Sequence, residues 1–281
     1  MTVVVAVVSS DGIALASDSA TTQTRTLNGV TSTNNIWNSA NKIFNLRKTW
    51  PLAALTFGRA DIEGLSIASH AKDLRCRLTG TVDDPDVAVL DPAAFTVEQV
   101  AQAMADYFQP RCDAEPNGGT LGFLVAGIGA TEKSPEVWDV LLDGLGGRNM
   151  NQVLPPGETG IVHQGMTDAI TRLVDGAGQG LGHVLEAMGA LPPGAGEPFA
   201  ETVRDGLRMD WAWPGMPLGE TIDMAKFLVD TQINFTRFMP GDAIVGGPVE
   251  IAALTKHEGF KWVERKHYYP PELNPTIHGG E

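Results

Sequence analysis

The first part of the chain alternates between short apolar runs and polar stretches. Residues 2–9 are dominated by β-branched side chains, which predicts a buried strand. Ser10-Asp11-Gly12 predicts a turn and residues 13–18 predict a second strand, so together they indicate a β-hairpin. Residues 19–38 are polar and rich in Thr, Asn and Ser, which is typical of a loop or of a solvent-facing ribbon.

Later segments repeat two kinds of spacing. Apolar runs of strand length predict strands over residues 42–46, 51–57, 121–128, 137–142, 161–165, 249–255 and 260–265. Apolar positions at helical spacing predict helices over residues 60–74, 96–108, 167–174 and 218–238, with a shorter helix near 181–188. The second of these helices begins with Thr96-Val97-Glu98-Gln99, which fits a capping box.

The order of these elements is strands, two helices, strands, helices and strands. Such an order indicates an α+β fold in which helices stack on antiparallel sheets. We expect a single domain over residues 2–267, with insertions near 79–94 and 176–217. Residues 268–281 are predicted to be a Pro-rich tail.

The composition narrows the classes of partner. The formal net charge is −14 and the pI is about 4.8, so nucleic acid and anionic membranes are disfavoured as partners. The two cysteines, Cys76 and Cys112, have no metal-ligand spacing, and we expect neither a metal nor a cofactor. The apolar start of the chain is short and lacks a positively charged segment, and no apolar run reaches about 18 residues. We therefore expect a cytoplasmic protein.

Thr2 is the first candidate for chemistry. Removal of Met1 would leave a chain that begins with a threonine, which carries both a hydroxyl and a free α-amine. A hydroxyl needs a base to act as a nucleophile, and an α-amine has an ordinary pKa near 8. One residue would therefore supply both nucleophile and base. Threonine is also common after an initiator methionine, so this residue by itself indicates little.

Asp18 and Lys42 are the next candidates. Asp18 ends the second predicted strand, whose hairpin partner is the first strand, so its carboxylate is expected beside the N-terminus. Lys42 opens the third strand. A lysine near Thr2 would lower the pKa of the hydroxyl, and Asp18 would orient that lysine through an ion pair. Each charge is equally consistent with a solvated position at a sheet edge.

These residues resemble a known family. Thr2, the β-branched run and Asp18 sixteen residues later are similar to the start of proteasome β subunits and of the related bacterial threonine peptidase. Three further segments carry the resemblance: Asn41-Lys42-Ile43-Phe44, Phe57-Gly58-Arg59-Ala60-Asp61 and Asp242-Ala243-Ile244-Val245-Gly246-Gly247.

The resemblance implies a four-layer αββα sandwich of the Ntn-hydrolase type, with two antiparallel sheets flanked by helices. It implies a threonine endopeptidase with Thr2 as the nucleophile, Asp18, Lys42 and Asp242 in support, and a backbone N–H of Gly58 in the oxyanion hole (or of Phe57, if the alignment slips by one residue). It also implies a homo-oligomeric ring that hydrolyses peptides or unfolded proteins. Whether an ATPase partner feeds such a ring is left open.

Two departures from the family pattern stand out. Gln164 and Val245 occupy positions where the family has accessory serines, so the support of the amine differs and the role of Asp242 is less secure. Two alternatives stay open: a non-catalytic ring or scaffold subunit, and an Ntn amidohydrolase that acts on a small amide. Substrate preference is expected to depend on Thr22, Thr56 and Arg59, with Arg59 favouring acidic groups.

Overall fold

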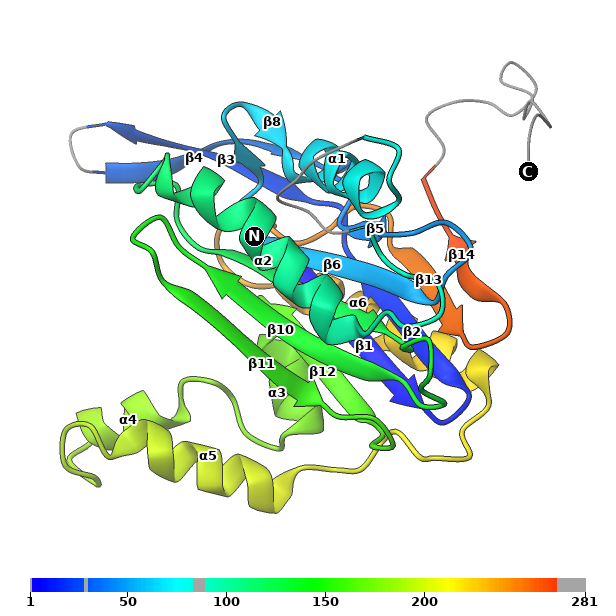
Figure 1. The fold of residues 1–281 in the computed structure, drawn as a ribbon. Coiled ribbons are helices and arrows are strands. Elements are labelled where there is room, and N and C mark those ends of the chain that lie inside the picture. Colours follow the sequence, from blue (N-terminus) through cyan, green and yellow to red (C-terminus); the bar gives the residue numbers. More distant parts are fainter. Residues whose placement is uncertain (1, 28–29, 83–88, 267–281) are drawn as a thin grey trace.

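The chain has a mixed α+β fold. The computed structural model describes residues 2–27, 30–82 and 89–266. Within these ranges it contains two five-stranded antiparallel sheets and six helices (Figure 1). No helix in the described ranges combines the length and the apolar character that crossing a bilayer requires.

The first sheet is built around the start of the chain. Its strand order is β12-β1-β2-β13-β14. The predicted hairpin is confirmed, because β1 and β2 pair antiparallel from Val4 opposite Ser17 to Ser9 opposite Gly12. The strands span Val3–Ser9 (β1), Gly12–Ser17 (β2), Gly160–Gly165 (β12), Glu250–Thr255 (β13) and Gly259–Glu264 (β14).

The second sheet has the order β11-β10-β9-β6-β5. Sequence patterning missed β11, because this edge strand is mostly exposed and its residues are largely polar. The strands predicted over residues 121–128 and 137–142 form β9 and β10, which pair antiparallel. The strands span Ile43–Asn45 (β5), Leu52–Gly58 (β6), Leu121–Gly127 (β9), Glu136–Leu142 (β10) and Arg148–Leu154 (β11).

The apolar residues of β1 face two different clusters. Val4, Ala6 and Val8 pack between the two sheets, against residues such as Leu55 and Leu124 of the second sheet. The alternate residues Val3, Val5 and Val7 pack with helices α3 (Asp168–Val174) and α6 (Leu218–Arg237). Both faces of β1 are therefore covered, which explains why its apolar run is continuous rather than alternating.

Helices α1 (Ile67–Leu78) and α2 (Val97–Asp113) cover the other face of the second sheet. The capping box is confirmed at Thr96 and Gln99. The prediction that the first helix starts near residue 60 was wrong. A small hairpin, β7 (Asp61–Ile62) and β8 (Leu65–Ser66), comes first, and the Ser66 side chain accepts the N–H of Ser69 as the helix N-cap.

The segments without clear patterning form local pairs. Residues 19–38 contain β3 (Thr21–Leu27) and β4 (Val30–Trp37), so the ribbon alternative is confirmed. The insertion near 176–217 holds the short helix α4 (Leu181–Ala187), as predicted, and a second helix α5 (Gly196–Leu207) that patterning missed. These two helices lie against each other at the lower left of Figure 1. Residues 83–88 of the predicted linker and the predicted tail 268–281 lie outside the described residues.

A buried polar contact joins β12 of the first sheet to β10 of the second. The side-chain amide of Gln164 on β12 donates to Asp139 Oδ2 on β10 at 2.7 Å. Asp139 is buried, and its other carboxylate oxygen has no hydrogen-bond partner among the described residues. Burial raises the pKa of Asp139 to about 6, and the hydrogen bond from Gln164 opposes that rise. An ionised Asp139 therefore costs the fold free energy at neutral pH.

We predict that Asp139→Asn raises the free energy of unfolding at about pH 8 by about 1–3 kcal/mol. The variant keeps an acceptor for Gln164 and removes the buried charge. A carboxyl with a raised folded pKa stabilises the fold when protonated, and that contribution is lost as the pH rises from 3.8 towards about 6.

Urea denaturation across this pH range measures the effect. The difference between Asp139→Asn and the wild type should grow from about pH 4 to pH 6 and then stay constant. Glu158→Gln makes the same chemical change at an exposed position and should show no such growth. A difference that does not depend on pH would contradict the assignment.

Candidate active site

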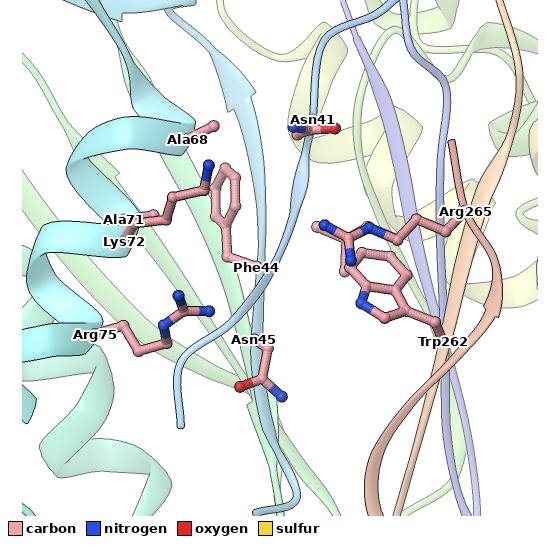
Figure 2. A pocket seen from close by; sticks show the side chains of 10 residues that line it. Asn41, Phe44, Asn45, Ala68, Ala71, Lys72, Arg75, Trp262 and Arg265 are labelled. Carbon is pink, nitrogen blue, oxygen red and sulfur yellow. The ribbon is translucent and has the colours of Figure 1, made fainter. Parts of the chain in front are cut away.

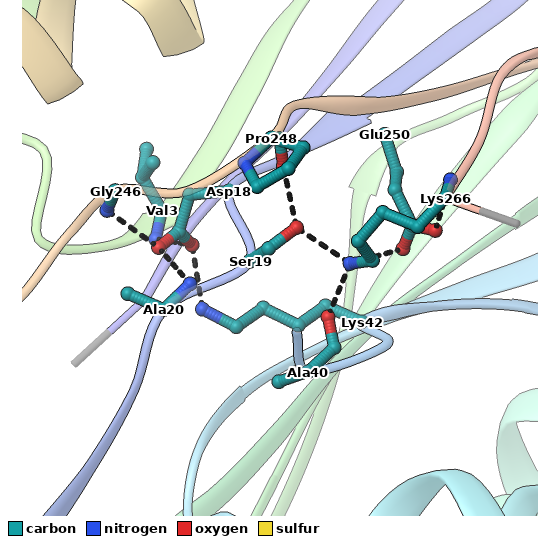
Figure 3. A network of polar contacts seen from close by, with 10 residues as sticks. All are labelled: Val3, Asp18, Ser19, Ala20, Ala40, Lys42, Gly246, Pro248, Glu250 and Lys266. Carbon is teal, nitrogen blue, oxygen red and sulfur yellow. Dashed lines mark hydrogen bonds and ion pairs between the residues drawn. The ribbon is translucent and has the colours of Figure 1, made fainter. Parts of the chain in front are cut away.

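Asp18 lies at the end of β2, directly beside the start of β1. The N–H of Val3 donates to Asp18 Oδ1 at 3.0 Å, and the N–H of Asp18 donates to the carbonyl of Val3 at 3.2 Å. Figure 3 shows the carboxylate at the centre of a polar network. The hairpin register therefore places the carboxylate next to the N-terminal end of the described chain, as the sequence predicted.

Lys42 completes a buried ion pair with this carboxylate. Lys42 Nζ lies 2.6 Å from Asp18 Oδ1 (Figure 3), and the two residues are 4% and 0% exposed. The N–H groups of Ala20 and Gly246 each donate to Asp18 Oδ2 at 3.1 Å. The carboxylate thus accepts bonds from four donors, which is the condition under which a buried charge is tolerated. The alternative of two solvated edge charges is wrong.

Burial also changes the proton affinity of the lysine. Desolvation lowers the pKa of Lys42, the carboxylate of Asp18 opposes that shift, and the positive charge of Lys266 adds to it. Lys42 therefore releases its proton more readily than an exposed lysine does. A lysine with this property can stabilise a nearby oxyanion or take part in proton transfer.

The backbone of Thr2 is held by the neighbouring strand. Its carbonyl accepts the N–H of Met166 at 2.7 Å. Gly165 has a φ of +90°, and a Cβ at this position would lie 2.1 Å from the carbonyl oxygen of Thr2. Only glycine allows this close approach. Thr2 is 7% exposed, and Met1 lies outside the described residues.

Thr2 and Lys42 line the same cavity. Its volume is about 900 Å³, and its wall also includes Thr22, Thr56 and Gly58. A cavity of this size is within the range of small-molecule and peptide sites. Four of the five predicted site residues therefore meet here: Thr2, Lys42 and Gly58 in the wall, and Asp18 through its pairing with Lys42.

Gly58 has the geometry expected of a backbone donor. Its φ is +82°, and a Cβ would lie 2.3 Å from the carbonyl oxygen of Thr120, so the position requires glycine. The N–H of Thr56 donates to the carbonyl of Lys42 at 2.9 Å. Because N–H groups alternate between the two edges of a strand, the N–H of Gly58 points to the same edge as Lys42.

Arg59 lies in the cavity wall and is already paired. Its guanidinium forms an ion pair with Glu115, and its Nε donates to the carbonyl of Asp61 at 2.6 Å. The charge is already neutralised within the cavity wall. The structure therefore gives no support to the prediction that Arg59 selects acidic groups.

Asp242 is not brought to the ion pair. The side chain of Asp242 is exposed. The residue of this segment that contacts the network is Gly246, whose N–H donates to Asp18. Val245, at a predicted accessory position, is 1% exposed and packs in the apolar cluster around α6. Gln164, at the other such position, bonds to Asp139 instead.

A second ion pair was not predicted. Lys266 Nζ lies 3.0 Å from Glu250 Oε2, and it donates to Ser19 Oγ at 2.5 Å and to the carbonyl of Ala40 at 2.6 Å (Figure 3). Glu250 is fully buried on β13. The sequence does contain a signal for it, because this glutamate interrupts the apolar run of residues 249–254.

A smaller cavity of about 90 Å³ lies between α1 and β14. Figure 2 shows Lys72 and Arg75 of α1 on one side of it, and Trp262 of β14 and the following Arg265 on the other. None of the residues proposed for chemistry lines it. In the described ranges, no group of three or more His, Cys, Asp or Glu side chains has an arrangement suited to a metal ion.

Comparisons with known proteins identify the fold. The chain is similar to the structure of Anbu (ancestral beta-subunit) from Yersinia bercovieri, with a TM-score of 0.52 and 15% identity over 94% of this chain and 88% of that one. It is also similar to the structure titled helical assembly of the Anbu complex from Pseudomonas aeruginosa, with a TM-score of 0.51 and 16% identity over 95% and 88%. No family model matches the chain, and no curated protein does.

These findings correct the resemblance drawn from the sequence. The two structures named above are those of Anbu proteins, which are proteasome-like but distinct. No family model or curated protein supports a proteasome β subunit or the related bacterial peptidase. The physical reason is visible at Gln164 and Val245, which provide no hydroxyl where that family has serines. At this level of identity, the similarity establishes that the chain has the fold of the Anbu structures.

Proposed function

We propose that the chain is an N-terminal-nucleophile hydrolase with Thr2 as the nucleophile, acting on peptide bonds. Removal of Met1 creates the active form, because it frees the α-amine of Thr2. The observation that carries the proposal is the buried Asp18–Lys42 pair, whose lysine lines the same cavity as Thr2. A buried charge pair at a cavity wall is costly to keep in a fold, and it is typical of sites that perform chemistry.

The proposed reaction follows from these positions. The hydroxyl of Thr2 attacks the peptide carbonyl, and the α-amine accepts its proton, directly or through water. Lys42 stabilises the developing negative charge on Oγ, with Asp18 fixing its ammonium. The N–H of Gly58 donates to the oxyanion of the tetrahedral intermediate. The α-amine returns the proton to the leaving nitrogen, and water then hydrolyses the ester on Thr2.

The fold and the assembly extend the proposal. The two sheets and the helices that cover them support a four-layer αββα arrangement of the Ntn-hydrolase type. One similar structure is that of a helical assembly of an Anbu complex. By analogy we include self-association of this chain, with sites enclosed in an oligomer, in the proposal.

Peptides are favoured over small amides by the size of the cavity. A volume of about 900 Å³ exceeds what one small amide would fill, and its wall carries polar backbone and threonine side chains that suit an extended chain. A small-amide hydrolase is the second candidate. Comparing the turnover of peptides with that of small amides distinguishes the two.

We predict that Thr2→Ala abolishes turnover of fluorogenic peptides, by about 10³-fold or more, without changing the fold. Alanine at position 2 still permits removal of Met1, so the variant keeps the α-amine and loses the hydroxyl together with one methyl group. Thr2→Ser keeps hydroxyl and amine and should retain measurable turnover.

Steady-state assays with peptides and with single-residue amides measure both variants. Turnover of peptides in preference to small amides supports the peptidase, and the reverse preference supports an amidohydrolase. Wild-type turnover by Thr2→Ala would exclude Thr2 as the nucleophile. A wild type that has lost Met1 and hydrolyses neither class would support a non-catalytic subunit.

We also predict that Asp18→Asn lowers the free energy of unfolding by about 3–5 kcal/mol, because it leaves Lys42 as an unpaired buried charge. The double variant Asp18→Asn/Lys42→Met removes both charges and should recover part of that stability without recovering turnover. Urea denaturation and peptide assays together separate the two effects. Recovery of turnover in the double variant would show that the pair has a structural role alone.

A further inference from the structure

The network around Lys266 contains two buried pairs of opposite charge side by side. Lys266 pairs with Glu250, and Lys42 pairs with Asp18. The two lysines are close enough for each pair to act on the other: Lys266 disfavours the charge on Lys42, and Asp18 favours the charge on Lys266. The side chains of Lys266 and Glu250 are 9% and 1% exposed, so solvent screens this interaction weakly.

Lys266 joins the two chain segments that carry the proposed catalytic pair. Its ammonium donates to Ser19, the residue after Asp18, and to the carbonyl of Ala40, two residues before Lys42. The same two segments are joined directly by the N–H of Ala40, which donates to the carbonyl of Ser19 at 3.0 Å. Figure 3 shows the ammonium of Lys266 bonded to both Ser19 and Ala40.

Glu250 and Ser19 fix the lysine in turn. The N–H of Lys266 donates to Glu250 Oε1 at 3.3 Å, and its ammonium pairs with Oε2 of the same carboxylate. The hydroxyl of Ser19 donates to the carbonyl of Pro248 and is therefore oriented to accept from Lys266. Both the backbone and the side chain of Lys266 are held, so its ammonium is oriented towards Ser19 and Ala40.

We propose that Lys266, held by Glu250, is a positioning residue for the Asp18–Lys42 pair. It clamps the turn after Asp18 to the segment before Lys42, and so sets the distance between carboxylate and ammonium beside Thr2. The inference rests on the proposed function for its catalytic consequence, but the positioning itself is a property of the fold. It makes the site depend on a residue that follows the last strand of the first sheet.

The test uses the double variant Glu250→Gln/Lys266→Met, which removes the second pair without leaving a buried unpaired charge. The matched control is Lys256→Met. Lys256 also donates to three acceptors, the carbonyls of Gly129, Ala130 and Glu132. These follow the C-terminal end of β9, whereas Gly58 pairs with Leu121 at the N-terminal end of that strand.

Hydrogen exchange gives the first readout, independent of activity. The N–H groups of Val3, Ala20 and Gly246 donate to Asp18 and report its position. In the double variant they should exchange at least about tenfold faster, and in Lys256→Met they should exchange at the wild-type rate. Wild-type exchange in a folded double variant would overturn the proposal.

Peptide turnover gives the second readout. The double variant should lose about 10- to 100-fold in kcat with little change in KM, because Thr2 and its partners are displaced while the cavity is kept. The positive charge of Lys266 lowers the pKa of Lys42, so its loss should also move the alkaline limb of the pH profile upward. The charges that act on the two lysines are Asp18 and Lys266 for Lys42, and Glu250, Asp18 and Arg265 for Lys266. Unchanged kcat and an unmoved pH profile would overturn the catalytic part of the proposal.

The two readouts separate the failure of this inference from failure of the proposed function. If the wild type hydrolyses no peptide, faster exchange in the double variant still establishes the positioning role. If the double variant does not fold, Ser19→Ala removes one acceptor of Lys266 without changing any charge. It should speed exchange at Val3 and Ala20, and unchanged exchange there would count against the clamp.

Discussion

The buried carboxylate of Asp18 is the constraint on which the rest of the site depends. It accepts hydrogen bonds from Val3 on β1, Ala20 after β2, Gly246 before β13 and the ammonium of Lys42 before β5. An ionised carboxylate without water is tolerated only if its oxygens are occupied in this way. One side chain thus ties together four segments from both sheets, and it fixes the chain next to Thr2 in doing so.

The surrounding fold supplies the rigidity that this arrangement needs. The apolar side chains of β1 pack on both faces, against the second sheet and against α3 and α6. This double burial gives the first strand little freedom to move relative to β2, and a site on packed strands is better defined than one on loops. Gly165 and Gly58 then allow the backbone to approach closely where side chains would block it. Thr2, Lys42 and Gly58 all line one cavity.

Sequence patterning predicted the parts of the site that are local to strands. Thr2, Asp18 and Lys42 sit at the ends of β-branched or apolar runs, and a hairpin register brings the first two together. It failed where contacts join distant segments. The Lys266–Glu250 pair joins β13 to the residues that follow β14. The exposed polar strand β11 has no apolar signature, and the apolar residues Ile62 and Leu65 of the β7–β8 hairpin are three residues apart, as on one face of a helix. The resemblance to proteasome β subunits rested on short motifs at strand ends, and the comparisons did not support it.

The central claim is that the end of the processed chain forms a reactive centre with the Asp18–Lys42 pair. Intact-mass spectrometry after treatment with a hydroxyl-directed β-lactone tests it most directly, combined with peptide mapping of the adduct. We expect a chain that lacks Met1 and carries one adduct on Thr2, and no adduct in Lys42→Ala. A chain that retains Met1, or an adduct that maps elsewhere and persists in Lys42→Ala, would contradict the claim.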